Sequence, residues 1–482
     1  MNIPLIMVVL YLLVTTVIGM SFAKKNQNSN QYFVADRSLG IVLIASLLFS
    51  EIIAGAGTIG NAASAYQGGL SSVWANWGMC IGCIIFIPLV GKFYRAMAVR
   101  HNVQSVPKAY ACIFDKRSQI LMVVIISIAY VIMYSTQAMA AAAIIAPLLG
   151  VEAIVIVWVC TGLFILVTVT GGMKGIAWMN VLHSAVMYLG MFIVAFRAVS
   201  SVGGIEVLRA SVPSEFFSLT QPNLHTTIAN ALGTAISFLA SANVANATFS
   251  AKSLRISNRG ILLAGLVVVP FAVCPAIIGI CANVALPGIS PNNALFSMAN
   301  SLGSLYGGAV SMAIIAAIWS TAPALLLIIS TTMTRDLFKG YLYPQATDLQ
   351  QMWFSRIVAV VVGVTGTAVG FGASSILDQM LGAFQIRSIV GIVLAVAVFW
   401  PRVNKDAAFW SMLGGGAVAV YWQFGGQPFG IAPIWPGALV CLLIMVPITL
   451  ASREKVSPGF RLYSEAVKEM ENMESEASGL SE

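Results

Sequence analysis

Long apolar segments recur along almost the whole chain, and they constrain its fold more than any other feature. Most of them reach the roughly 20 residues that an α-helix needs to cross the hydrocarbon core of a bilayer. Only 9% of the residues are charged, whereas a soluble domain has about 25%. We therefore predict an all-α polytopic membrane protein with the lipid bilayer as its solvent. The thirteen predicted transmembrane helices fall near residues 3–22, 39–66, 70–95, 117–148, 151–170, 176–199, 227–250, 259–285, 306–334, 350–372, 376–401, 406–424 and 433–452.

The first segment, residues 3–22, raises the question of a cleaved signal peptide. No basic residue precedes its apolar run, whereas a signal peptide has a basic start and a shorter apolar core. We therefore expect this segment to stay in the protein as a transmembrane helix.

Lysine and arginine are unevenly distributed among the loops. When the loops are assigned alternately to the two sides, nearly all of the 25 basic residues fall after odd-numbered spans or in residues 453–482. Loops rich in Lys and Arg stay in the cytoplasm, so we predict a multi-pass protein of the cell (inner) membrane. Its N-terminus would lie outside and its C-terminus in the cytoplasm. The net charge of +8 then reflects topology, and no nucleic-acid partner is expected.

The C-terminal segment, residues 453–482, is predicted to be a cytoplasmic tail. It becomes acidic towards its end and has few large apolar residues. A short amphipathic helix is one interpretation, but this composition favours a solvated and weakly ordered tail.

Two of the seven cysteines, Cys80 and Cys83, form a Cys-x-x-Cys pair. A metal or redox site would be one interpretation, but the pair lies in an apolar helix and no second pair exists. We interpret the cysteines as small core residues.

The second span contains the stretch FSEIIAGAGTIG, residues 49–60, in which one carboxylate, Glu51, precedes a cluster of glycines. Clustered glycines disfavour a helix, and free backbone groups are tolerated in a membrane only where they face protein or a water-filled cavity. Interrupted helices supply carbonyl groups to cations in many transporters. Close packing of helices through small residues is the alternative explanation.

The ninth span contains AAIWSTAPALLLIISTTMTRDLF, residues 316–338. Ala317, Ser320 and Thr321 have the spacing of one helical face. One carbonyl and two hydroxyl groups are hard oxygen ligands that suit an alkali cation. Alternatively, the two hydroxyls bond only to the backbone of their own helix, as membrane Ser and Thr commonly do.

Four stretches together resemble the sodium/solute symporter family, and the resemblance covers residues 1–452. The matching stretches, in chain order, are YFVADRSLG (32–40), IGNAASAYQGG (59–69), GGMKGIAWMNVLHSAVMYLG (171–190), and AAIWSTAPALLL with TTMTRDLF inside 316–338.

The resemblance implies a single transmembrane transporter domain, residues 1–452, with a LeuT-type core. Two inverted five-helix repeats would form this core, one over spans 2–6 (39–199) and one over spans 7–11 (within 227–424). One extra helix would precede them and two would follow. The resemblance also implies a sodium site between the first and eighth core helices. Its implied ligands are the carbonyls of Ser50, Ile53 and Ala317 and the hydroxyls of Ser320 and Thr321.

Several positions depart from the family pattern. Ala54 and Gly57 lack the oxygen side chains with which some members hold a second sodium ion, and Asn180 stands where an Asp is common. We therefore expect one sodium ion per transport cycle. Pro323 replaces another common Asp, which leaves the local backbone geometry of the ninth span open.

His183 replaces a common Gln of the family. It is either a buried neutral histidine bonded to a carbonyl or a titrating group through which protons replace or modulate sodium.

Glu51 and Arg387 are the charged residues predicted to lie deep inside spans, where ionisable side chains usually mark function. Three roles are open. The two residues form a structural ion pair, Arg387 binds a solute carboxylate through its planar fork, or Glu51 binds a solute ammonium or a proton.

Asn76 is a third candidate for solute contact, because it aligns with a polar substrate contact in sugar-carrying relatives. Trp74 and Trp77 flank it and are expected to wall a pocket. The seventh span is unusually polar and is expected to line the same cavity through Ser237, Ser241, Asn243 and Asn246, although such residues also join helices.

We predict a sodium-coupled symporter that imports a small polar organic solute, and we favour an organic anion or a zwitterion. No motif for catalysis or ATP binding is present, so we do not expect an enzyme. A proton-coupled carrier that uses Glu51 and His183 is the alternative, followed by a channel or a transport-fold sensor. The expected partners are the solute, Na+ and the lipid bilayer, and no oligomer is required.

Overall fold

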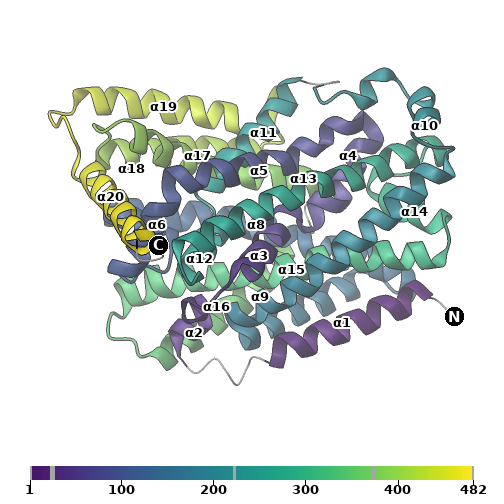
Figure 1. The fold of residues 1–482 in the computed structure, drawn as a ribbon, viewed down its shortest axis with the longest axis horizontal. Helices are drawn as coiled ribbons and strands as arrows, with labels where there is room; N and C mark the ends of the chain where they lie inside the picture. Colours follow the sequence, from purple (N-terminus) through teal and green to yellow (C-terminus); the bar gives the residue numbers. More distant parts are fainter. Residues whose placement is uncertain (1–2, 22–27, 221–223, 372–375, 480–482) are drawn as a thin grey trace.

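The computed structural model describes residues 3–21, 28–220, 224–371 and 376–479, and the regular elements in these ranges are helices (Figure 1). Helices satisfy their own backbone hydrogen bonds, which is a requirement inside a bilayer. Ten described helical stretches are long and apolar enough to cross a membrane. They are Ile3–Ser21, Gly57–Arg100, Lys116–Leu149, Ala153–Ser201, Leu224–Ser250, Leu254–Ala285, Ser304–Leu342, Asp348–Gly370, Asp378–Phe399 and Ile434–Ala451.

The predicted multi-pass helical architecture is confirmed, while the count of thirteen stays a prediction. Two predicted spans, 151–170 and 176–199, share the single helix Ala153–Ser201. The predicted span 39–66 is divided between a short apolar helix, Ile41–Gly55, and the beginning of the next long stretch. The predicted span 406–424 coincides with α18 (Lys405–Phe424), which is outside the ten.

The predicted interruption within residues 49–60 is confirmed. Helix α3 (Ile41–Gly55) breaks at Ala54, whose φ of 42° and ψ of −172° are not helical. A π-helical turn, η3 (Ala56–Gly60), follows and leads into α4 (Asn61–Gly68). Figure 1 shows α3 in the middle of the molecule, and its buried residues include every position from Leu48 to Gly55.

A second interrupted helix corresponds to the polar seventh span. Helix α11 (Leu224–Leu239) ends before Ala240, and α12 (Ala242–Ser250) begins after Ser241, whose hydroxyl caps it by accepting from the amide of Val244. Both predicted repeats thus begin with a broken helix, although the limits of the repeats stay a prediction.

Helix α15 (Ser304–Thr332) lies at the centre of the molecule and continues as the wider helical turn η8 (Met333–Leu342). It packs on α3, α8 (Lys116–Leu149) and α9 (Ala153–Ser201). A helix that is apolar all round belongs in such a buried position. Pro323 is accommodated inside α15, and the carbonyl of Pro323 accepts a hydrogen bond from the Thr168 hydroxyl of α9 at 3.2 Å.

The break in α9 occurs at Gly172, with φ 58° and ψ −171°, a backbone conformation that favours glycine. It separates the two predicted spans that share this helix. Other helices of the described chain are α2 (Ser29–Val34), α5 (Trp74–Phe86), α6 (Lys92–Arg100), α7 (Val106–Ile113), α10 (Ile205–Ser211), α13 (Leu254–Ala285), α14 (Ala294–Ser301), α16 (Asp348–Gly370) and α17 (Ile376–Phe399).

Three helices lie at the edge of the molecule, and they correspond in sequence to the three predicted additions to the core, whose limits stay a prediction. Helix α1 (Ile3–Ser21) runs along the lower edge in Figure 1, against α9 and α15. Helices α18 and α19 (Ile434–Ala451) pack on each other at the upper left.

The expectation of a weakly ordered tail is wrong for its described part. Residues Pro458–Gly479 form helix α20, which packs on α6 and α7. Ala466 and Met470 are buried, and the Tyr463 hydroxyl donates to the Leu89 carbonyl at 2.5 Å. Ion pairs join Lys92 to Glu471 at 2.6 Å and Arg100 to Glu469. Glu469 and Glu471 of the tail thus have basic partners on α6 that composition alone cannot reveal.

Candidate functional site

The two interrupted helices meet at the side chain of Glu51. The hydroxyl of Ser241, in the break between α11 and α12, donates to Glu51 Oε1 at 2.8 Å. Arg387 of α17 approaches the same oxygen with Nη1 at 3.3 Å. The side chains of Glu51 and Arg387 are 2% and 0% exposed, so this ion pair is withdrawn from solvent. The two residues thus form the ion pair that was one of the three roles left open by the sequence.

Arg387 has further partners on two other helices. Its Nε donates to the Ser237 hydroxyl of α11 at 2.7 Å, and its Nη1 also donates to the Tyr130 hydroxyl of α8 at 2.9 Å. Its guanidinium carbon lies 5.3 Å from the ring centroids of both Tyr130 and Phe384. Aromatic rings and hydroxyls of this kind compensate a desolvated guanidinium.

Tyr130 also contacts the break between α11 and α12. Its hydroxyl accepts from the backbone N–H of Ala242, the first residue of α12, at 2.8 Å. A helix N-terminus has N–H groups without intrahelical partners, and here a side chain from α8 satisfies one of them. Sequence reasoning missed Tyr130. Its polar neighbours on α8 at helical spacing, Ser127, Tyr134 and Gln137, were a usable signal in an otherwise apolar span.

The ion pair leaves two polar atoms without hydrogen-bond partners. They are Oε2 of Glu51 and Nη2 of Arg387, both buried. A buried polar atom that lacks a partner costs about 1–3 kcal/mol, and more when the group is charged. The arrangement therefore presents one free acceptor and one free donor on adjacent, oppositely charged groups.

The predicted sodium ligands assemble where α3 and α15 meet. The Thr321 hydroxyl lies 2.9 Å from the carbonyl oxygen of Ser50 and 2.9 Å from that of Ala317. The Ser320 hydroxyl is 2.8 Å from the same Ala317 carbonyl. Ile53, one turn beyond Ser50, is fully buried just before the break at Ala54. Both hydroxyls thus bond to backbone, as the alternative interpretation expected, but Thr321 also bridges to the other helix.

The donor set fits a small alkali cation. Carbonyl and hydroxyl oxygens carry no full charge and are hard ligands, and the non-helical backbone at Ala54 turns carbonyl groups away from regular helix bonding. Ser50, Ala317, Ser320 and Thr321 would hold the ion together with Ile53, and the ion would supply a positive charge that links α3 to α15.

Asn180 of α9 adjoins this group. Its amide nitrogen donates to the Ser50 hydroxyl at 2.8 Å, while its Oδ1 is buried and has no partner. The amide therefore positions the residue that would supply a carbonyl ligand. Ala54 and Gly57 contribute no side-chain oxygen here.

His183 lies one turn beyond Asn180 but faces a different helix. Its Nδ1 is hydrogen-bonded to the Tyr11 hydroxyl of α1, and its Nε2 is buried without a partner. The predicted carbonyl partner is therefore replaced by a phenol. Among the described residues, no hydrogen bond connects His183 with Glu51.

Asn76 is buried next to the interrupted α3–α4 segment. Its amide nitrogen is 3.3 Å from the Gly57 carbonyl, and a Cβ at Gly57 would lie only 2.8 Å from Asn76 Oδ1. Trp74 and Trp77 contact each other edge to face, and their indole N–H groups donate to carbonyls of Leu219 and Val269. Asn76 therefore contacts η3, directly after the break in α3. The two tryptophans connect α5 to neighbouring segments.

The helices around Asn243 enclose little space. A cavity of only about 10 Å³ lies between α3, α9, α12 and α15, and Asn243 is among its lining residues, with Leu47 and Ala324. A space of this size holds no more than one water molecule. Asn246 lies on α12, as Asn243 does, and is also buried.

Residues 32–415 match the family model described as the sodium:solute symporter family. The chain belongs to this family. It is 23% identical to a sodium/proline symporter of Escherichia coli, over 95% of this chain and 94% of that protein. It is 26% identical to a sodium/glucose cotransporter of Vibrio parahaemolyticus, over 83% and 80% of the two chains. The family transports solutes and catalyses no chemical reaction, so the chain is a secondary transporter.

Solved structures share its architecture. A Na+-coupled sialic acid symporter in a substrate-bound, outward-open state superimposes with a TM-score of 0.82 at 16% identity, over 94% of this chain and 98% of that one. The transporter MhsT in complex with L-phenylalanine gives a TM-score of 0.53 at 15% identity, over 88% and 98%. At these identities the likeness shows the fold, and it confirms the predicted LeuT-type arrangement.

Proposed function

We propose that this sodium-coupled symporter carries one Na+ at the junction of α3 and α15 together with one small zwitterionic solute at the Glu51–Arg387 pair. The observation that carries the proposal is the Thr321 hydroxyl, 2.9 Å from the Ser50 carbonyl. This contact brings oxygen atoms of the two helices close together, which supports a shared ion site. Their chemistry suits Na+, and a cation there would draw the interrupted α3 and the central α15 together.

The proposed solute follows from the two unpartnered atoms of the ion pair. Arg387 Nη2 is a free donor and Glu51 Oε2 is a free acceptor. A solute that carries both a carboxylate and an ammonium group would satisfy both atoms and neutralise both charges. A neutral polyol would leave the charges as they are, and a simple anion would satisfy only Arg387. The sodium/proline relatives transport such a zwitterion, which supports the proposal.

Coupling between the two sites has a direct structural basis. Ser50 supplies a proposed sodium ligand, and the next residue, Glu51, supplies the proposed solute contact. An ion that fixes the backbone at Ser50 therefore also fixes the carboxylate of Glu51. Each ligand would then increase the affinity for the other, as linkage requires.

Uptake of labelled amino acids, organic acids and sugars into proteoliposomes tests the proposal. We expect accumulation of an amino acid that depends on an inward sodium gradient and persists when the pH is equal on both sides. Uptake of a compound without an ammonium group as the preferred solute would contradict the zwitterion. Uptake driven by a proton gradient in the absence of sodium would favour the proton-coupled alternative, for which Glu51 is the better placed residue.

A further inference from the structure

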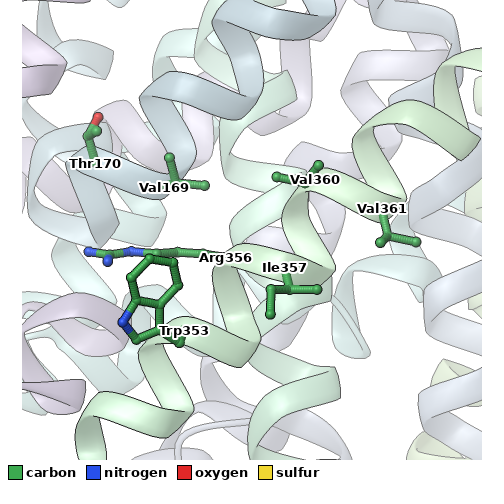
Figure 2. Close-up of a pocket in the computed structure, with 7 residues that line it drawn as sticks. All are labelled: Val169, Thr170, Trp353, Arg356, Ile357, Val360 and Val361. Atoms are coloured by element: carbon green, nitrogen blue, oxygen red, sulfur yellow. The ribbon is translucent and has the colours of Figure 1, made fainter.

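A groove on the outer surface of the molecule is separate from the transport site. It encloses about 540 Å³ between the first part of α9 and the N-terminal half of α16. Figure 2 shows Val169 and Thr170 on one side and Trp353, Arg356, Ile357, Val360 and Val361 on the other. Trp353, Ile357 and Val361 are each more than half exposed, so the groove opens to the surroundings of the protein.

The groove has one charged end and one apolar end. In Figure 2 the guanidinium of Arg356 extends past the ring of Trp353, whereas Ile357, Val360 and Val361 continue along α16. The guanidinium carbon of Arg356 is 5.4 Å from the Trp353 ring centroid. Four of the seven lining residues are aliphatic. A ligand that fits must therefore join an anionic group to an alkyl chain.

Arg356 contacts the Trp353 ring but has no acidic partner among the described residues. Its Nε is buried without a hydrogen-bond partner, and no ion pair of the described residues includes it. An arginine in this state is costly in a membrane unless an anion pairs with it. Its rigid fork suits the oxygen atoms of a phosphate.

The charged end of the groove lies towards the N-terminal end of α16, from which a long arginine side chain can reach back to the headgroup region of a bilayer. Helix α16 begins at Asp348, so Arg356 lies about 12 Å from its start at 1.5 Å per residue. Trp353 lies one turn earlier, and tryptophan is enriched at membrane–water interfaces. Positive-inside topology places this end at the cytoplasmic leaflet, where anionic lipids attract basic residues.

We propose that the groove binds an anionic phospholipid, with its phosphate on Arg356 and Trp353 and an acyl chain along Ile357, Val360 and Val361. The occupant is a lipid of the bilayer and not free phosphate, because the aliphatic wall adds nothing to the binding of an inorganic ion. The site is independent of the sodium and solute sites and of their assignment.

The test uses the purified full-length protein in detergent, titrated with phosphatidylglycerol or with phosphatidylcholine of the same acyl chains. The thermal unfolding midpoint reports binding. We expect phosphatidylglycerol to raise it more than phosphatidylcholine does, and inorganic phosphate to leave it unchanged. In Arg356→Gln the half-maximal lipid concentration should increase roughly fivefold, because one basic residue near a membrane surface contributes about 1 kcal/mol.

Two further variants distinguish a specific lipid-binding site from non-specific electrostatic attraction of anionic lipid. Arg259→Gln removes an exposed arginine from a different membrane helix, α13, and should leave the titration as in the wild type. Val360→Trp keeps the charge but fills the apolar end, and it should weaken binding of phosphatidylglycerol. Equal weakening in Arg356→Gln and Arg259→Gln, an unaltered titration in Val360→Trp, or an equal response to inorganic phosphate would overturn the proposal.

Discussion

The hydroxyl of Ser241 donates a 2.8 Å hydrogen bond to the carboxylate of Glu51, so the break in one interrupted helix is joined directly to the other. Glu51 lies three residues before the break at Ala54, and Ser241 lies within the break between α11 and α12. Arg387 approaches the same carboxylate oxygen. Under the proposed function, a solute that draws Glu51 or Arg387 away would therefore act on both broken helices at once.

The first prediction concerns the ion pair. Removing one charge by Glu51→Gln or Arg387→Gln leaves the other buried and uncompensated, which should lower the free energy of unfolding by about 3–5 kcal/mol. The double variant should be much milder. Thermal unfolding of the four proteins in this cycle measures the coupling between the two residues.

The same four proteins distinguish a purely structural ion pair from an ion pair that also binds solute. If the pair contacts solute, the double variant should fold but bind the solute identified by uptake far more weakly. Recovery of both folding and affinity in the double variant would contradict the solute role and leave a purely structural pair.

The second prediction concerns Tyr130, the residue that sequence reasoning missed. Tyr130→Phe deletes the hydroxyl that accepts from Ala242 N–H and from Arg387. Two buried donors lose this acceptor, at about 1–3 kcal/mol for each group left unsatisfied. We expect a clearly lower unfolding midpoint and weaker solute affinity. Tyr188→Phe, on a half-buried tyrosine of α9, is the matched control and should unfold as the wild type does.

The third prediction is a stoichiometry of one sodium ion per solute. Ala54 and Gly57 offer no side-chain oxygen, and the amide nitrogen of Asn180 is directed to Ser50. The initial rate of uptake should therefore depend hyperbolically on sodium concentration, with a Hill coefficient close to one. A reversal potential that requires two sodium ions for each solute would show that a further site exists.

The fourth prediction concerns the C-terminal helix α20. Its exposed ion pairs with α6 each contribute roughly 0–1 kcal/mol, so the buried side chains must hold most of the contact. Met470→Asp should release the helix, and limited proteolysis should then cleave the tail much faster. Glu471→Gln, which removes one exposed ion pair, should change the cleavage rate little. Equal rates for wild type and Met470→Asp would mean that α20 is not docked in solution.

Local patterns in the sequence predicted the parts of the site that depend on backbone and spacing. The glycines after Glu51 predicted the interruption of α3, and the spacing of Ala317, Ser320 and Thr321 placed them on one face of α15. For the two charged residues inside spans, the sequence made an ion pair one of three open roles, because few other partners exist for them in a membrane.

The parts that could not be predicted depend on which distant helix faces a given residue. Tyr130 is 112 positions from Ala242, and Tyr11 is 172 positions from His183. Nothing in the local sequence specifies these contacts. The docking of α20 likewise depends on its packing against α6, a helix more than 350 residues earlier in the chain. The composition correctly indicates an acidic tail, but it does not reveal that the tail packs on α6 and α7.

The central claim is that Ser320 and Thr321 bind sodium, and a sodium titration of the purified protein tests it most directly. A ligand that binds only the folded protein raises its unfolding midpoint, so the midpoint should increase with sodium at constant ionic strength, balanced with choline. The control is Ser330→Ala with Thr331→Ala, two hydroxyls of the same helix that bond to the Leu327 carbonyl. It should keep the wild-type sodium dependence.

In Ser320→Ala with Thr321→Ala, the half-maximal sodium concentration should increase roughly tenfold or more, because each interaction with a charged group contributes about 1.5–3 kcal/mol. The variant should still fold, because in the structure both hydroxyls donate only to backbone carbonyls, and their loss leaves no buried donor unsatisfied. A folded double variant with the sodium dependence of the wild type would contradict the assignment of the site.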